Sequence, residues 1–452
     1  MYNIVIGIYL IGVAIASLFN EKVRKMWQGE RRAIRDIKAK LDPEAKYVWV
    51  HAASLGEFEQ GRPIIERLRV EHPEYKVLLT FFSPSGYEVR KNYDGADIVC
   101  YLPIDTVMNA RRFLRTIHPV CALFIKYEFW YNYLHILKHR GVPVYSVSSI
   151  FRPGQIFFRW YGHQYGRVLK CFTHFFVQNE ESKRLLEEKL KLTNVSVTGD
   201  TRFDRVLTIA EKARHLPVAE AFKGDKRLFI AGSSWQPDEQ IFMPYFGRKK
   251  QSQGADTMPS DSADMQTAGK NDAWKLIIAP HVIAEFHLRQ IETLAHANGL
   301  TTVRYTDIID QFPSKELTVE ELHTKFHTIY CQLQQADVLI VNCFGLLSSI
   351  YQYADVAYVG GGFGVSIHNL PEAAVWYKPV IFGPNNHKFQ EAQDLKACEG
   401  GMEITDDTSF AAVMDRLSTD AAFLKHCSDA AGTYVASHSG ATRAVLDKID
   451  WR

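Results

Sequence analysis

The chain has 452 residues, of which 46% are hydrophobic, and a formal net charge of +2. This length exceeds the size at which a single hydrophobic core stops growing, so we expect two domains; the near balance of charge argues against nucleic acid as a partner. The seven cysteines are odd in number and form no Cys-x-x-Cys pair, which argues against a disulfide framework or a zinc site and implies a reducing compartment.

The first 20 residues carry no charged side chain, and Ile4–Phe19 is almost wholly apolar, slightly short of a comfortable bilayer span. No basic residue precedes this run and no small-residue cleavage site closes it, so a removed signal peptide is less favoured. We predict a membrane anchor at residues 1–20. The alternative is a buried N-terminal helix.

A charged segment follows directly. Residues 21–40 hold eight Lys/Arg against three Asp/Glu, and such an excess beside a membrane attracts anionic lipid headgroups. We expect residues 21–45 to form a basic juxtamembrane helix. The positive-inside rule then leaves the rest of the chain in the cytoplasm.

From residue 46 to residue 210, short apolar runs alternate with amphipathic stretches, which is typical of a doubly wound parallel sheet in a Rossmann-like domain. The runs expected to form strands are Tyr47–Val50, Val77–Phe81, Ile98–Leu102, Val120–Ile125, Val142–Val147, Phe172–Gln178 and Val195–Val197. Residues 211–226 are charged and are predicted to link this domain to the next.

Residues 227–407 repeat the same alternation, so we predict a second Rossmann-like domain. Its expected strands are Arg227–Ala231, Leu276–Ala279, Thr301–Arg304, Val338–Val341, Val356–Val359 and Val380–Phe382. The segment 247–272 has almost no apolar residues and is predicted to be a disordered surface loop. Residues 408–452 are predicted to be helices that pack back on the first domain.

Two such domains facing a cleft would bring the carboxyl ends of both sheets together, where open parallel sheets bind ligands. This favours a nucleotide-sugar transferase of the GT-B architecture. A dinucleotide dehydrogenase is the rival class, but it requires G-x-G-x-x-G after the first strand. Here the first strand leads into His51-Ala-Ala-Ser-Leu-Gly-Glu57, which lacks that fingerprint.

A glycine-rich turn follows the expected strand Val356–Val359. Gly360, Gly361, Gly362 and Gly364 precede Asn369-Leu-Pro-Glu372, which combines a side-chain cap with a proline near the first helical position. Such a turn lets backbone N–H groups approach a phosphate, and Glu372 could accept hydrogen bonds from ribose hydroxyls. The alternative is that the glycines only relieve crowding at the strand end.

Two carboxylates follow strands of the first domain. Glu57 begins a helix after a glycine turn, where it could act as a general base; Ser54-x-x-Glu57 could equally be a capping box without a catalytic role. Glu128 lies in Lys126-Tyr-Glu-Phe-Trp-Tyr-Asn132, and its alternative is a solvated loop charge.

Further polar residues lie at other strand ends. Ser233 and Ser234 close the first strand of the second domain and could hold an anion with free N–H groups, or simply cap the next helix. His281 follows another strand and is compatible with an anion contact, although a lone histidine is more often structural. Arg152 and Arg159 could meet lipid phosphates or form a solvated face.

Seven segments resemble, in this order, the successive motifs of the Kdo transferases: HAASLGEFEQGRPIIERL, IKYEFWYN with GVPVYSVSS, VTGDTRFDRV, AGSSWQPDE, ADVAYVGGGFGVSIHNLPEAA and FGPNNHKFQEA. These are membrane-associated GT-B enzymes that move 3-deoxy-D-manno-octulosonic acid (Kdo) from CMP-Kdo to the lipid A precursor in lipopolysaccharide biosynthesis. The resemblance spans roughly residues 1–400 and includes the N-terminal anchor, which it places in the inner membrane.

The resemblance implies roles for named residues. Glu57 would be the base and Glu128 a second essential acid. The donor would be bound by Ser233, Ser234, His281, Gly361, Gly362, Asn369, Glu372 and Asn386, and the acceptor by Ser54, Gly56, Arg152 and Arg159. The family's usual Gly-Asn-x-Lys is Gly199-Asp200-Thr201-Arg202 here, its Arg-His is His281-Val282, and its Gly-Glu-Leu is Gly345-Leu346-Leu347.

We therefore expect an inverting, metal-independent Kdo transferase that needs no cofactor. The sequence contains no Asp-x-Asp motif to hold a divalent ion, in agreement with that expectation. Two other functions remain open. One is a lipid-linked transferase that uses a UDP-hexose, and the other is a membrane-tethered sugar- or lipid-binding protein without catalysis.

Overall fold

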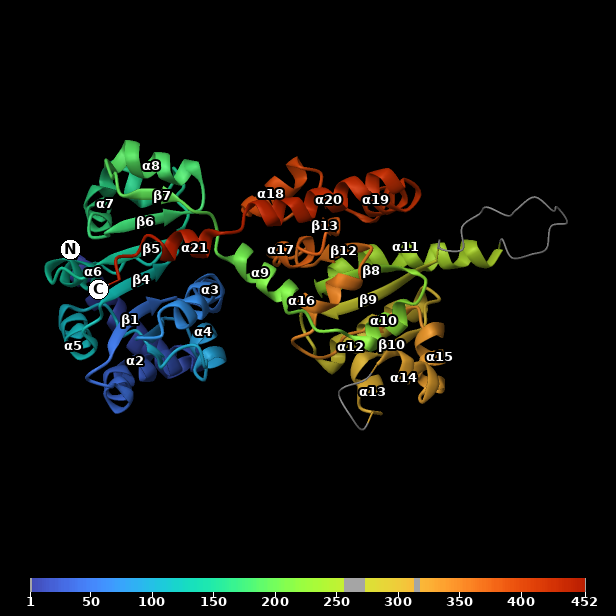
Figure 1. Ribbon diagram of the computed structural model, residues 1–452, viewed down its shortest axis with the longest axis horizontal. Helices are drawn as coiled ribbons and strands as arrows, with labels where there is room; N and C mark the ends of the chain where they lie inside the picture. Colours follow the sequence, from blue (N-terminus) through green and yellow to red (C-terminus); the bar gives the residue numbers. More distant parts are fainter. Residues whose placement is uncertain (1, 256–272, 313–317, 452) are drawn as a thin grey trace. The chain divides into compact units, whose positions relative to one another are not determined.

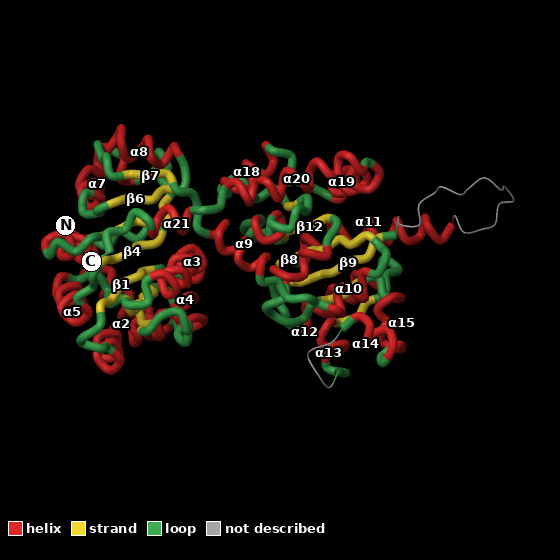
Figure 2. Tube along the Cα trace, viewed as in Figure 1, coloured by secondary structure: helices red, strands yellow, loops and turns green. Residues whose placement is uncertain are grey.

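The computed structural model describes residues 2–255, 273–312 and 318–451. The chain divides into two compact units, Met1–Arg205 with His438–Arg452, and Val206–Ser437. Each unit contains one parallel sheet flanked by helices (Figure 1). The strands lie inside and the helices outside in both units (Figure 2). These two doubly wound units confirm the predicted α/β, GT-B fold class.

The first unit contains the sheet predicted from the first set of apolar runs. Its strands are β1 Lys46–His51, β2 Tyr75–Phe81, β3 Ile98–Tyr101, β4 Cys121–Ile125, β5 Val144–Ser149, β6 His174–Val177 and β7 Val195–Val197. Its helices are α1 Tyr2–Phe19, α2 Glu21–Lys40, α3 Leu55–Glu71, α4 Pro84–Arg90, α5 Val107–Ile117, α6 Tyr131–His139, α7 His163–Leu169, α8 Glu180–Leu190 and α21 Ala441–Leu446, with short 3₁₀ turns η1 Ile156–Phe158 and η2 Trp160–Gly162.

The strands of this sheet have the parallel order β3-β2-β1-β4-β5-β6-β7. Successive residues alternate between two hydrophobic clusters, so Trp49 and Phe124 pack on one face while Val50 and Leu123 pack on the other. This burial on both faces explains why the strands appear in the sequence as continuous apolar runs. The strand order reverses between β1 and β4, and ligands of open parallel sheets bind at such a reversal.

The second unit repeats the architecture. Its strands are β8 Arg227–Ser234, β9 Trp274–Pro280, β10 Thr302–Arg304, β11 Val338–Ile340, β12 Val356–Val359, β13 Val380–Phe382 and β14 Gly401–Glu403. Its helices are α10 Pro217–Lys223, α11 Gln236–Ala255, α12 Glu285–Ala297, α13 Tyr305–Ile309, α14 Val319–Thr324, α15 His327–Gln335, α16 Leu347–Ile350, α17 Pro371–Ala374, α18 Gln390–Ala397, α19 Asp407–Thr419 and α20 Ala421–Ser437, with the 3₁₀ turn η3 Tyr351–Tyr353; α9 Arg202–Glu211 links the two units.

The second sheet has the parallel order β10-β11-β9-β8-β12-β13-β14 and reverses between β8 and β12. The glycine-rich turn follows β12 and the two serines close β8, so both candidate donor segments lie at this reversal. Residues 408–452 were predicted to pack back on the first domain, but α19 and α20 belong to the second unit. Residues 438–452 return to the first unit, where α21 packs through Val445 and Leu446 into the core beside β1 and β4. The expected cleft between the two sheets stays a prediction.

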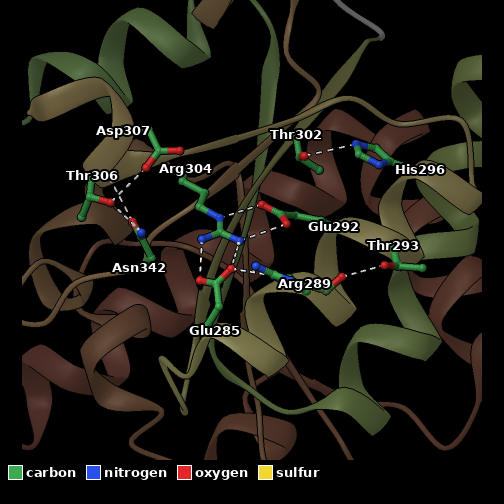
Figure 3. Close-up of polar contacts among 10 residues, drawn as sticks. All are labelled: Glu285, Arg289, Glu292, Thr293, His296, Thr302, Arg304, Thr306, Asp307 and Asn342. Carbon is green, nitrogen blue, oxygen red and sulfur yellow. Dashed lines mark hydrogen bonds and ion pairs between the residues drawn. The ribbon is translucent and has the colours of Figure 1, made fainter. Parts of the chain in front are cut away.

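A group of ion pairs joins α12 to β10 (Figure 3). The Arg304 guanidinium donates to Glu292 at 2.6 Å and to Glu285 at 2.8 Å, and Arg289 donates to the same Glu285 carboxylate at 2.8 Å. Hydrogen bonds from the two arginines lower the pKa of Glu285 to about 2. The group therefore keeps its charges above strongly acidic pH and ties the helix to the sheet edge.

The segment predicted as a loop at 247–272 differs from the structure in its first part. Residues 247–255 continue α11 as a helix, and residues 256–272 lie outside the described residues. Lys250 donates to the backbone oxygen of Gly299 at 3.0 Å and to Asp337 at 2.7 Å, and Lys249 pairs with Asp415. The polar residues at 247–255 therefore form the end of a helix, and ion pairs to Asp337 and Asp415 hold this end in place.

The first helix, α1, is mostly exposed. It is long and apolar enough to cross a membrane by length and composition, with a mean hydropathy of 2.1, and only Val13 and Ser17 are buried. The alternative of a buried N-terminal helix is therefore wrong. Its first residues contact the unit, because the Tyr2 hydroxyl donates to Asp105 at 2.6 Å and Asn132 donates to Asn3 at 2.8 Å.

Candidate functional site

The two predicted catalytic acids lie on either side of the strand reversal in the first unit. Glu57 is in the first turn of α3, directly after β1, and Glu128 is in the loop that leaves β4. Since β1 and β4 are paired neighbours, both loops leave the same edge of the sheet. The pKa of Tyr127, the residue before Glu128, is raised mainly by burial and also by the negative charge of Glu57. Glu57 therefore lies near the loop that carries Glu128.

Glu57 does not form the capping box that its spacing allows. Ser54 is the N-cap residue of α3, but its side chain accepts no backbone N–H; instead its hydroxyl donates to the Glu57 carboxylate. The short serine side chain and the half-buried glutamate therefore satisfy each other. Gly56 is exposed and has room for a side chain, since the nearest atom to an added Cβ would be the Ser54 hydroxyl at 3.8 Å.

Glu128 is held by a histidine that the sequence interpretation did not single out. His51, the last residue of β1, has no exposed surface, and its Nε2 lies 3.2 Å from Glu128 Oε2. The same oxygen accepts a hydrogen bond from the Trp130 indole at 2.7 Å. The position of His51 at the carboxyl end of a buried strand, just before the glycine turn, is the sequence signal that points to it.

A chain of hydrogen bonds continues from His51 into the core. The Trp49 indole donates to the Thr80 hydroxyl at 2.8 Å, and that hydroxyl lies 2.8 Å from His51 Nδ1. His51 Nδ1 also lies 3.2 Å from the Thr80 backbone oxygen, and the Trp130 indole nitrogen lies 3.1 Å from His51 Nε2, so both ring nitrogens of His51 are engaged. These contacts fix the position of Glu128 from the core.

The predicted acceptor arginines lie after β5, and one of them reaches this edge. Arg152 donates to the Tyr127 hydroxyl at 3.4 Å, and Tyr127 precedes Glu128 in the loop after β4. Arg159 is exposed and donates to the backbone oxygen of Gly154 at 3.4 Å. The structure therefore brings Arg152 to the loop that carries Glu128, whereas Arg159 contacts its own loop.

The altered family motif at residues 199–202 forms a buried ion pair. Asp200 is 5% exposed and accepts hydrogen bonds from Arg202 at 2.9 Å, Gln60 at 3.0 Å and Gln178 at 3.1 Å. Burial alone would raise the pKa of Asp200, but the Arg202 charge and these hydrogen bonds lower it instead. The two residues that depart from the family motif, Asp200 and Arg202, thus pair with each other as opposite charges.

The serine pair of the second unit is split between two roles. Ser234 is fully buried, and its hydroxyl donates to Glu239 at 2.9 Å, while the other oxygen of Glu239 lies 3.0 Å from His287 Nε2. The hydrogen bond that His287 donates to Glu239 raises the pKa of this histidine. The Ser234 hydroxyl proton is therefore used in a buried hydrogen bond within the unit. Ser233 has a φ of 54° at the strand end.

Asp238 uses the backbone N–H groups that were expected to be free. Its Oδ2 accepts from the N–H of Trp235 at 2.8 Å and from that of Gly361 at 2.9 Å, and its Oδ1 accepts from the Tyr358 hydroxyl. The prediction that these N–H groups are open to an anion is wrong for both residues. A Cβ on Gly362 would lie 2.6 Å from Gly383, so crowding requires glycine there.

His281 belongs to a stack of three rings. It lies 4.7 Å from the Trp235 ring and 4.4 Å from the His368 ring, centroid to centroid, and the Trp235 indole donates to His368 Nε2 at 3.3 Å. Burial lowers the pKa of both histidines, and that of His368 falls to about 4. Near neutral pH the stack therefore offers flat uncharged rings rather than a cation.

The helix after the glycine turn begins differently from the prediction. Leu370 is the N-cap residue of α17, and Asn369 caps nothing; its side-chain amide donates to Glu372 at 2.8 Å, and Ser348 donates to the same carboxylate at 3.2 Å. Proline after Leu370 already fixes the helical start, which leaves Asn369 free to orient Glu372. The buried Asn369 Oδ1 has no hydrogen-bond partner among the described residues.

Asn386 is 1% exposed and fully bonded. Its amide donates to the Gly383 oxygen and to Glu403, each at 2.9 Å, and its oxygen accepts from Gln393 and Lys396. The side chain therefore fixes the loop after β13, and its contact with the donor stays a prediction. In the described part of the chain, no three His, Cys, Asp or Glu side chains are grouped as metal ligands.

Comparisons with known proteins agree with the motif resemblance. Residues 27–205 match the model of the family described as 3-Deoxy-D-manno-octulosonic-acid transferase (kdotransferase). The chain is 27% identical to the 3-deoxy-D-manno-octulosonic acid transferase of Bordetella pertussis over 427 residues, which cover 90% of this chain and 88% of that one. It is 26% identical to the enzyme of the same name from Aquifex aeolicus (strain VF5), over 82% of this chain and 85% of that one.

Among solved structures, the UDP-GlcNAc 2-epimerase from Neisseria meningitidis bound to UDP-GlcNAc aligns with a TM-score of 0.57 at 13% identity, covering 89% of this chain and 98% of that one. A likeness at this identity supports the two-unit fold. The matched family and the two relatives together confirm that this chain resembles the Kdo transferases along most of its length.

Proposed function

We propose that this protein is a glycosyltransferase that moves Kdo from CMP-Kdo to a lipid A precursor. The observation that carries the proposal is the position of the two acids, Glu57 and Glu128, and of the glycine-rich turn that leads to Glu372. The acids lie at the strand reversal of the first sheet and the turn lies at that of the second. The similarity to named Kdo transferases supports the choice of donor and acceptor. Residues 46–210 would bind the acceptor and residues 227–407 the donor.

In the proposed reaction, Glu57 accepts the proton of an acceptor hydroxyl as that oxygen attacks the anomeric carbon of Kdo. The bond from this carbon to the CMP phosphate breaks, and the phosphate leaves with the electron pair. Attack on the face opposite to the phosphate inverts the anomeric configuration. We infer that the transfer needs no metal ion, because a carboxylate base and a phosphate leaving group account for every proton and charge.

Arg152 and Glu128 would act on the acceptor side. The Arg152 guanidinium, held at the Tyr127 hydroxyl, is a suitable partner for a phosphate of the lipid acceptor. Glu128, fixed by His51 and Trp130, would orient the hydroxyl that Glu57 deprotonates. Ser54 would hold the Glu57 carboxylate in place through its hydroxyl.

The direct test incubates the purified full-length protein with CMP-Kdo and a lipid A precursor and measures the product mass. Addition of at least one Kdo residue supports the proposal. Product formed from a UDP-hexose instead would assign a different donor. Binding of CMP-Kdo without any product would indicate a tethered binding protein.

The donor side makes a separate prediction about Glu372. Glu372→Ala is expected to raise the KM for CMP-Kdo about tenfold or more, with a smaller effect on the KM for the acceptor, because the lost charged hydrogen bonds would be to the ribose alone. Initial rates at varied donor and acceptor concentrations measure both. Glu391→Ala on α18 is a control, since it removes another carboxylate from the same unit. An unchanged KM for the donor removes Glu372 from the site.

We also propose that α1 attaches the protein to the inner membrane, with both units in the cytoplasm. Exposed apolar side chains along the helix support this, among them Ile4, Ile8, Ile11, Ile15 and Leu18. The basic residues of α2, which begins two residues after α1, would lie at the anionic lipid surface.

Deleting residues 1–19 tests the attachment and keeps Asn20, whose side chain caps α2. The truncated protein is expected to move from the membrane fraction to the soluble fraction while its melting stays cooperative, because α1 buries only two residues. Fractionation and thermal melting give the measurement. Truncated protein that stays in the membrane fraction would contradict the proposed attachment, and early melting would show that contacts of α1, such as the Tyr2–Asp105 hydrogen bond, stabilise the first unit.

A further inference from the structure

A second polar site lies in the first unit, beside the connection that follows β3. A surface pocket of about 500 Å³ is formed by α1, α2, the connection after β3 and α5. Its lining includes the apolar side chains of Leu10, Trp27 and Ile34. Leu10 comes from the exposed helix α1, so the pocket adjoins the surface proposed to meet the membrane.

Glu30 lines this pocket and is the unusual feature in it. The residue is 5% exposed, and neither carboxylate oxygen has a hydrogen-bond partner among the described residues. Burial raises the pKa of Glu30 to about 8. A buried carboxyl group without a partner is costly, and a ligand that brings a cation with N–H donors would remove that cost.

Two arginines line the same pocket. Arg31, the next residue on α2, and Arg112 on α5 are both exposed, and the Arg31 guanidinium lies over the Trp27 ring, 5.5 Å from its centroid. Guanidinium groups bind phosphate oxygens with two parallel hydrogen bonds. The pocket thus combines one carboxyl group, two positive charges and an apolar wall.

We propose that this pocket binds the phosphoethanolamine headgroup of a membrane lipid. The ammonium group would donate to Glu30, the phosphate would accept from Arg31 and Arg112, and the first part of an acyl chain would lie against Leu10, Trp27 and Ile34. The position beside α1 makes a membrane lipid the source. The site is independent of the transferase reaction and would hold the first unit at the bilayer in a defined orientation.

The test compares binding of the full-length protein to vesicles of phosphatidylcholine with binding to vesicles in which half of it is replaced by phosphatidylethanolamine. Both headgroups carry one phosphate and one positive charge, but only the ethanolamine has N–H donors for Glu30. The parent protein is expected to bind the ethanolamine vesicles about tenfold more tightly, the effect of one charge-assisted hydrogen bond. Equal binding to both vesicles would overturn the proposal.

Glu30→Gln is expected to abolish this preference, and Glu21→Gln, an exposed glutamate on the same helix, is expected to keep it. Arg112→Gln should weaken binding to both vesicles, while its exposed neighbour Arg111→Gln, which does not line the pocket, should do so less. A preference retained by Glu30→Gln contradicts the assignment. Thermal melting of each variant separates lost binding from lost folding.

Soluble glycerophosphoethanolamine distinguishes the headgroup from the membrane as the source of affinity. It is expected to compete with ethanolamine vesicles for the parent protein and to have no effect on Glu30→Gln. Inorganic phosphate at the same concentration should compete less, because it has no ammonium group. If phosphate competes as well as glycerophosphoethanolamine, the pocket is a plain anion site and the role of Glu30 is refuted.

Discussion

Glu57→Gln is expected to lower the turnover number about 10²–10⁴-fold, the contribution of a general base, while the protein melts close to the parent temperature. Glutamine keeps the size of the side chain and an oxygen that can accept the Ser54 hydroxyl, but it cannot take up a proton from the acceptor. Because α3 has no side-chain cap bond to lose, the variant should not incur the usual cost of a lost cap.

Initial rates, thermal melting and CMP binding on one preparation measure the effect of Glu57→Gln. Glu71→Gln, at the opposite end of α3 and paired with Arg67, is the matched control and is expected to keep full activity. A Glu57→Gln variant that retains substantial turnover with normal stability would show that Glu57 only accepts the serine hydroxyl. The base would then be sought at Glu128.

The sheets could be predicted because parallel strands buried on both faces need continuous apolar runs. Val356–Val359 and Val380–Phe382 therefore appear in the sequence with the bounds that the structure gives them. β14 was missed because Gly401-Met402-Glu403 has one apolar side chain and lies at the sheet edge. The end of α11 was missed because its stabilising partners, Asp337 and Asp415, are distant in sequence.

The candidate site was only partly predictable, for a related reason. Strand ends and glycine turns can be recognised locally, so Glu57, Glu128 and Glu372 were found. Which backbone N–H groups remain free depends on partners elsewhere in the chain, and Asp238 occupies those of Trp235 and Gly361. His51 was overlooked because it closes an apolar strand, and its partner in the site, Glu128, lies 77 residues away in the sequence.

The buried chain behind Glu128 leads to the second large effect. Glu128→Gln is expected to reduce turnover about 10²-fold or more, since an amide cannot provide the fixed negative charge that would orient the acceptor hydroxyl. Trp130→Phe removes one hydrogen bond to Glu128 and leaves the carboxylate and a ring that can stack on Phe82. The turnover number of Trp130→Phe is expected to fall about tenfold, while its binding of the donor stays unchanged.

Initial rates and melting temperatures separate a functional role of Glu128 from a structural one. A purely structural Glu128 would lower the melting temperature of Glu128→Gln and leave turnover at the parent value, which contradicts the proposal. The double variant Glu57→Gln with Glu128→Gln then tests how the acids act. If Glu128 orients the hydroxyl that Glu57 deprotonates, the two losses depend on each other and the double variant is no slower than about the worse single one. Losses that multiply would mean that the acids act on different steps, and Glu128 would then serve acceptor binding independently of the proton transfer.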